Sequence, residues 1–157
     1  MNTESQDSFV GFIEDHDRIE VMKPLREDNL ALPIYLESVS AGFPSPADDY
    51  TEKSLDLNDL LIKNPAATFF VRVSGDSMIN AGMSSGDILV VDRSLDAKNK
   101  SIVIAVVNGE MTVKRLSLKN GEVFLCPENP KYKPIKITSE MYFEVWGVVR
   151  SVIHSTL

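Results

Sequence analysis

Ser77 has the residue type and the setting that covalent catalysis by a nucleophile requires. It stands in the sequence Val-Ser-Gly-Asp-Ser-Met, directly after a stretch that is typical of a strand. A serine at such a turn can present its hydroxyl to a substrate while nearby backbone N–H groups hold an oxyanion. Most serines in glycine-rich turns only satisfy backbone groups. A nucleophilic Ser77 therefore also requires a base.

Histidine is the usual base, and the chain has two, His16 in the acidic N-terminal part and His154 near the C-terminus. Neither has an orienting carboxylate in a strand context, so the sequence gives little support to a Ser-His-Asp triad. We expect both histidines to be solvated.

Lys114 is the alternative base, in the strand-like sequence Glu-Met-Thr-Val-Lys-Arg-Leu. A lysine can accept a proton if burial lowers its pKa by several units from the ordinary ~10.4. Side chains alternate along a strand, so Lys114 shares a face with Thr112 and Leu116. Alternation alone does not decide whether this face or the opposite one is buried.

A candidate substrate lies within the same chain. Residues 41–47 read Ala-Gly-Phe-Pro-Ser-Pro-Ala. Because proline disfavours helix at the residue before it, this stretch should be extended and exposed. Extended, accessible chain is what a protease can bind.

The elements that would position these residues are mainly strands. Asn108-Gly109 predicts a tight hairpin and Asn120-Gly121 a second turn. We predict a mostly β domain, a compact folded sheet or partly open barrel, preceded by an extended N-terminal arm. A short helix is expected over 51–62 with Leu57, Leu60 and Leu61 turned inward, and an extended segment over 32–39. The expected strands are 68–73, 88–92, 101–107, 110–116, 122–125 and 143–153.

Charge and composition exclude several classes of protein. The net charge is −7, and the first 41 residues hold nine acidic and three basic residues, which leaves −1 for the rest. Such a chain lacks the basic surface that duplex binding requires, so no direct sequence-specific DNA binding is expected. Cys126 is the single cysteine, so an internal disulfide and a zinc cluster are not expected. With no signal peptide, no membrane-length apolar run and no cofactor motif, we expect a cytoplasmic protein without metal or cofactor.

Three blocks of sequence together resemble the LexA-like family of self-cleaving serine–lysine proteases, and in particular its UmuD-type members. They are VSAGFPSPADDY at 39–50, FFVRVSGDSMINAGMSSGDILVVDRS at 69–94 and VNGEMTVKRL at 107–116. The likeness extends over about residues 32–152. Because three separate motifs coincide in the family's order, the resemblance is specific.

The resemblance implies a role for each matching position. Ser77 matches the nucleophile, Lys114 the general base and Ala41–Gly42 the bond that is cut. It implies an arm over 1–41 that self-cleavage removes, a linker with a short helix over 42–67, and a LexA C-terminal-like protease domain over 68–157 that forms a homodimer. Residues expected to support the site or its oxyanion are Asp76, Met78 and Thr112.

The resemblance also implies a biological role in SOS mutagenesis. A RecA–single-stranded-DNA filament would stimulate the cleavage, and the cleaved form would support translesion synthesis by a UmuC-like DNA polymerase. The acidic arm lacks a helix-turn-helix pattern, which favours the UmuD type over a repressor. A LexA-like repressor fragment and a dimerising interaction module without proteolysis remain as alternatives. A type I signal peptidase is disfavoured. Those enzymes are anchored in membranes and usually have proline two residues after the methionine of their serine motif, whereas here Ile79-Asn80 follows Met78 and no membrane segment is expected.

Overall fold

The computed structural model describes residues 20–23, 31–35 and 52–157. Ala41, Gly42 and His16 lie outside the described residues, as does most of the expected arm. Expectations that concern those positions therefore remain predictions.

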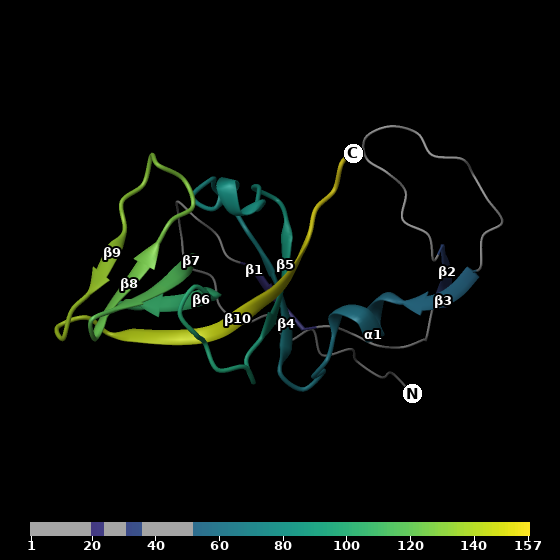
Figure 1. Ribbon diagram of the computed structural model, residues 1–157, viewed down its shortest axis with the longest axis horizontal. Coiled ribbons are helices and arrows are strands. Elements are labelled where there is room, and N and C mark those ends of the chain that lie inside the picture. The colour runs from purple at the N-terminus through teal and green to yellow at the C-terminus, as the bar shows by residue number, and fades with distance from the viewer. Residues whose placement is uncertain (1–19, 24–30, 36–51) are drawn as a thin grey trace, which may run out of the picture.

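Eight strands of the described residues form one antiparallel sheet, in the order β1-β4-β5-β10-β6-β7-β8-β9 (Figure 1). The sheet is open, with β1 at one edge and β9 at the other, which confirms the prediction of a mostly β domain that is not a closed barrel. All six predicted strands are present. The sheet strands are β1 (Glu20–Met22), β4 (Thr68–Arg72), β5 (Ile88–Asp92), β6 (Ile102–Val107), β7 (Glu110–Lys119), β8 (Glu122–Cys126), β9 (Ile135–Ile137) and β10 (Phe143–Ile153).

The long strand β10 joins the two halves of the sheet. Its first half pairs with β6 and its second half with β5, with a register shift on each side (Figure 1). Gly147 lies at the shift toward β6, and a Cβ there would be 2.6 Å from Val91 Cγ1. The absence of a side chain at this position lets β10 pass close to β5.

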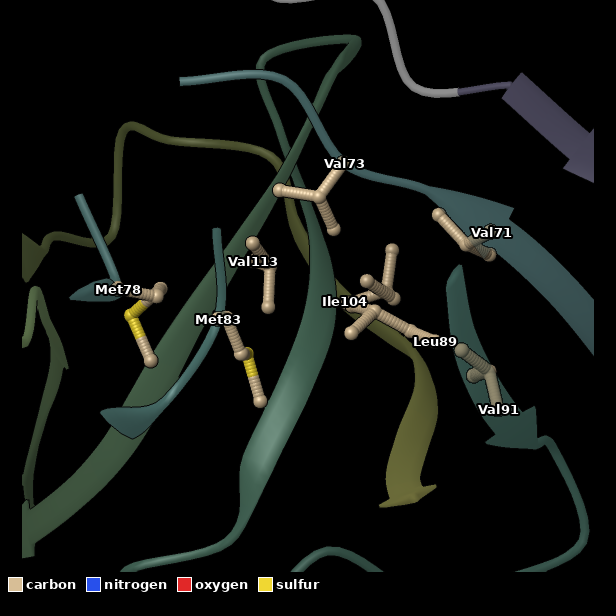
Figure 2. Packing of buried hydrophobic residues seen from close by; sticks show 8 residues of the cluster. All are labelled: Val71, Val73, Met78, Met83, Leu89, Val91, Ile104 and Val113. Carbon is tan, nitrogen blue, oxygen red and sulfur yellow. The ribbon is translucent and has the colours of Figure 1, made fainter. Parts of the chain in front are cut away.

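Two apolar clusters form the core. The first contains Met78, Met83 and Val113, with Val71, Val73, Leu89, Val91 and Ile104 (Figure 2). The second contains Val103, Ala105, Leu116 and Leu125. Val113 and Leu116 come from opposite faces of β7 and belong to different clusters, so both faces of this strand are covered.

The predicted helix over 51–62 is wrong in its first half. Glu52–Asp56 is strand β3, which pairs with β2 (Ala31–Tyr35) inside the expected extended segment 32–39, and the helix α1 occupies only Leu57–Leu61. Asp56 begins the helix by accepting a hydrogen bond from the Asn58 N–H at 2.7 Å. Leu57 and Leu60 are 56% and 49% exposed rather than turned inward. A helix this short buries no residue of its own, so packing does not orient it.

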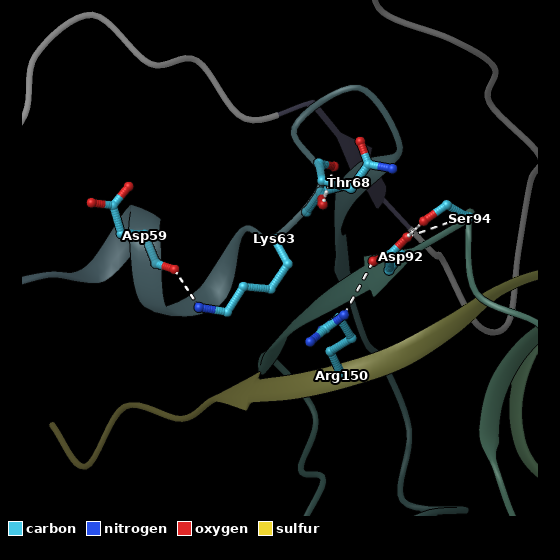
Figure 3. A network of polar contacts seen from close by, with 7 residues as sticks. Asp59, Lys63, Thr68, Asp92, Ser94 and Arg150 are labelled. Carbon is cyan, nitrogen blue, oxygen red and sulfur yellow. Dashed lines mark hydrogen bonds and ion pairs between the residues drawn. The ribbon is translucent and has the colours of Figure 1, made fainter.

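Asp92 at the end of β5 holds the loop after it and the strand beside it (Figure 3). Its Oδ1 accepts hydrogen bonds from the Ser94 N–H at 2.9 Å and the Ser94 hydroxyl at 2.6 Å, and Arg150 on β10 lies 3.3 Å from Oδ2. Burial acts most strongly on this group and would raise the pKa of Asp92. The bonds from Ser94 and the contact with Arg150 together outweigh burial, and they hold the pKa of Asp92 below its ordinary value.

Candidate active site

Ser77 lies in the loop between β4 and β5, and the two ends of that loop are tied together. The Val73 N–H donates to Asp87 O at 3.0 Å and the Gly86 N–H donates to Val73 O at 2.8 Å. Within the loop, Met78 and Met83 are 1% and 2% exposed and belong to the first core cluster (Figure 2). The two buried methionines anchor the loop to the core close to Ser77. Packing of the loop therefore defines the position of Ser77.

Lys114 enters the site from β7, where it pairs with Val103 of β6. Its side chain is largely buried. The Nζ atom donates to Ser77 Oγ at 3.0 Å, to Thr112 Oγ1 at 2.8 Å and to Val113 O at 2.9 Å. The structure thus brings together two residues that are 37 positions apart in the sequence, and Thr112 joins them.

The contact between Nζ and Ser77 Oγ can carry its proton on either atom, so the three contacts of Nζ are also compatible with a neutral amine. A neutral amine has two N–H donors and one lone pair, whereas a carbonyl oxygen can only accept. Val113 O and Thr112 Oγ1 can therefore take the two N–H groups, which leaves the lone pair for the hydroxyl proton of Ser77. The arrangement can hold a serine next to a base without a histidine.

A small hollow opens at this pair. It is lined by Ser77 and Lys114 together with Val73, Ser74, Met111, Thr112 and Val113. Apart from the hydroxyls and the amine, its walls come from the apolar side chains of Val73, Met111 and Val113. Such a hollow fits a small side chain beside the reacting atoms.

The backbone N–H of Ser77 is available as an oxyanion donor. In residues 52–157 and the two shorter described stretches, it donates to no backbone acceptor, and the same holds for the Met78 N–H. An unused donor next to a nucleophile is what an oxyanion site requires.

Asp76 and Met78 flank Ser77, but their side chains make contacts away from the Ser77–Lys114 pair. The Tyr132 O–H donates to Asp76 Oδ1 at 2.5 Å, and this bond is the main cause that lowers the pKa of Asp76. The Asp76 carboxylate therefore contacts Tyr132 and Lys131. Met78 is a core residue that anchors the loop.

His154 differs from the expectation that it lacks a carboxylate partner. Its Nδ1 lies 2.6 Å from Oδ1 of Asp87, which is 4% exposed. The pair lies outside the residues that line the hollow at Ser77. His154 is therefore not a candidate base for Ser77.

The sequence analysis missed residues 127–132, a segment between β8 and β9 that contacts the backbone of Ser77 and Asp76. The Glu128 N–H donates to Ser77 O at 2.8 Å, and Asn129 Nδ2 donates to Asp76 O at 2.9 Å. Its sequence, Pro-Glu-Asn-Pro-Lys-Tyr, gives a turn signal but carries no catalytic motif. Sequence alone could not reveal its contact with a loop some 50 residues away.

Two further findings concern other kinds of site. Among the described residues, no three side chains of the metal-binding types come together in a group that could hold an ion. The helices of the described part are all too short or too polar to cross a bilayer.

Comparisons with known proteins show which proteins the chain is similar to. The profile of the family described as Peptidase S24-like matches residues 33–150. Protein SamA of Salmonella typhimurium is 51% identical over 124 residues, which cover 79% of this chain and 86% of that protein. Protein ImpA of Salmonella typhimurium is 45% identical over 139 residues, 85% of this chain and 90% of that one. The LexA repressor of Aliivibrio salmonicida is 35% identical over 140 residues, 88% of this chain and 67% of that one.

Proposed function

The chain belongs to the Peptidase S24-like family, and from that premise we propose that it is a self-cleaving serine peptidase with Ser77 as nucleophile and Lys114 as general base. The observation that carries the proposal is the 3.0 Å contact between Lys114 Nζ and Ser77 Oγ in a largely buried setting. The bond proposed to be cut is Ala41–Gly42.

The proposed chemistry follows from the contacts of the two side chains. The neutral Lys114 amine takes the Ser77 hydroxyl proton as Oγ attacks the Ala41 carbonyl carbon. The negative charge on the Ala41 oxygen is held by the Ser77 N–H. Lys114 then gives the proton to the Gly42 nitrogen, which leaves, and a water molecule hydrolyses the ester between Ser77 and Ala41. The small hollow beside Ser77 is compatible with alanine on the acyl side of the bond.

Cleavage would change the charge of the protein. The first 41 residues carry a formal charge of −6 out of −7, so the remaining part would be nearly neutral. We propose that the cleaved form is a homodimer that supports translesion synthesis by a UmuC-like DNA polymerase in the cytoplasm during the SOS response. The acidic arm would act as a detachable segment that delays this activity until DNA damage.

We propose that a RecA–single-stranded-DNA filament is the trigger. The filament need not supply any reacting group. It need only favour the pose in which Ala41–Gly42 reaches Ser77, because a binding partner shifts the population of the form that it binds best.

The test incubates the full chain in three ways: at neutral pH alone, at neutral pH with RecA, a nucleotide and single-stranded DNA, and at alkaline pH without RecA. The proposal expects cleavage in the second and third incubations, the third because lysine loses its proton as the pH rises. Ser77→Ala should remain intact throughout. A wild-type chain that stays whole in all three would instead support an interaction module without proteolysis.

A further inference from the structure

We infer that residues 127–132, here called the clamp segment, aim the two backbone N–H groups beside the nucleophile, and that Asn129 is its positioning residue. The inference rests on the proposed function, since it assigns a role in the same reaction. It concerns residues that touch the backbone of the Ser77 loop and not the reacting atoms.

The first contact controls the direction of the Ser77 N–H. Asn129 Nδ2 donates to Asp76 O at 2.9 Å. The Asp76 carbonyl and the Ser77 N–H belong to one planar trans peptide, in which C=O and N–H point in opposite directions. A bond that fixes the carbonyl on the side of the clamp segment therefore fixes the N–H on the opposite side.

The second contact does the same for the next peptide. The Glu128 N–H donates to Ser77 O at 2.8 Å, and this carbonyl shares a plane with the Met78 N–H. Glu128 O in turn accepts from the Asn80 N–H at 2.9 Å, so the clamp segment and the Ser77 loop are joined by two hydrogen bonds at Glu128. Both carbonyls that flank Ser77 are thus held from one side. Within the described part of the chain, both corresponding N–H groups remain without a backbone acceptor.

The clamp segment is itself held in shape. Asn129 is 7% exposed, its Oδ1 accepts from the Lys131 N–H at 3.0 Å, and its backbone carbonyl accepts from the Tyr132 N–H. Glu128 forms an ion pair with Arg115, the residue that follows Lys114 on β7. The clamp segment therefore holds the two peptide groups on either side of Ser77 and also contacts β7, the strand that carries Lys114. Asn129 uses both ends of its amide, one to hold its own turn and one to hold Asp76 O.

Asn129→Asp tests this role in the full-length chain, because it keeps the acceptor and the shape of the side chain but removes the N–H donor. We expect self-cleavage at alkaline pH to slow by about 10- to 100-fold, somewhat less than the loss of an entire oxyanion donor. In Asn129→Leu, which adds no charge, the pH at which the rate is half-maximal should not move, because Asn129 bonds to Asp76 and Lys131 rather than to Lys114. A merely structural loosening of the site would expose Lys114 and would shift that pH.

Asn99→Asp is the matched control. The Asn99 Oδ1 also accepts from a backbone N–H, that of Leu118 at 2.8 Å, but Asn99 is exposed and belongs to a different turn. The same substitution should there leave the rate within twofold of wild type. Asn129→Leu, which removes the donor without adding charge, should slow the reaction like Asn129→Asp, and thermal unfolding should show that all three variants are folded.

Labelling by a small fluorophosphonate separates this inference from the proposed function. In that reaction Ser77 Oγ bonds to phosphorus, fluoride leaves and the serine proton passes to Lys114, so docking of residues 41 and 42 is not needed. Slower labelling of Asn129→Asp than of Asn99→Asp supports the clamp, even if the wild type does not cut itself. Equal rates of labelling and of cleavage in these two variants would overturn the clamp and leave the proposed function standing. A wild type that is neither labelled nor cut would overturn both.

Discussion

Thr112 Oγ1 lies 2.8 Å from Lys114 Nζ, on the same side of β7 two residues earlier. The lysine side chain is long and has many rotamers, so an amine that must meet one hydroxyl needs a second contact to hold it. Thr112 supplies that contact from the strand on which the lysine itself lies. The Lys114 amine is thus held by a contact within its own strand, in addition to its contact with the Ser77 loop.

Replacing Thr112 by valine should slow self-cleavage by about fivefold without abolishing it. Valine keeps the branched shape and loses the acceptor, and a hydrogen bond of this kind contributes about 1 kcal/mol. The rate of cleavage at alkaline pH, followed on gels, measures the effect. Thr112→Ser retains a hydroxyl and should cleave at nearly the wild-type rate. A valine variant as fast as the serine variant would show that the contact does not orient the amine.

Lys114→Arg should abolish self-cleavage at every pH up to the limit at which the protein remains folded. A guanidinium stays protonated and has no lone pair to accept the serine proton. Loss of general-base catalysis alone costs about 10²- to 10⁴-fold. The measurement is the rate at several alkaline pH values. Cleavage that rises with pH in the arginine variant would mean that another group removes the proton.

Gly147→Ala should destabilise the sheet by about 1–3 kcal/mol, because the added Cβ would lie 2.6 Å from Val91 Cγ1 and 3.3 Å from Arg93 Cγ. Urea unfolding measures the loss. Val91→Ala removes the atom that is struck, so the double variant should lose less stability than the sum of the two single variants. Additive losses would show that the strands do not approach as closely as described.

Asp92→Asn should lower stability at pH 7 by about 1–3 kcal/mol, because the amide loses the attraction of Arg150. The folded-state pKa of Asp92 is depressed, so its stabilisation is present above the ordinary carboxyl value of about 3.9 and is lost as the pH falls toward the folded value. Denaturant unfolding of both proteins between pH 7 and pH 3 should show the difference shrinking below about pH 4. A difference that is constant across this range would contradict the account.

The strands were predictable because their signals are local. Alternating apolar residues and the turn at Asn108-Gly109 define β6 and β7 without knowledge of any other part of the chain. The helix over 51–62 was predicted at the wrong length because the strand β3 depends on pairing with β2, which lies about 20 residues earlier. Pairing of this kind overrides local preference.

The candidate site was predictable only in part. Ser77 and Lys114 could be named from their motifs, but alternation along β7 could not decide which face is buried, since both faces pack against apolar clusters. Asn129 carries no motif at all. Its role depends on a contact 53 residues away, which the sequence does not encode locally.

The most direct test of the central claim is the intact mass of the products after the full-length chain is incubated with the RecA–single-stranded-DNA filament or at alkaline pH. The account predicts two products, one that ends at Ala41 and one that begins at Gly42, from the wild-type chain and none from Ser77→Ala. Products from Ser77→Ala with the same masses, or wild-type products cut at another bond, would show that Ser77 is not the nucleophile or that Ala41–Gly42 is not the bond.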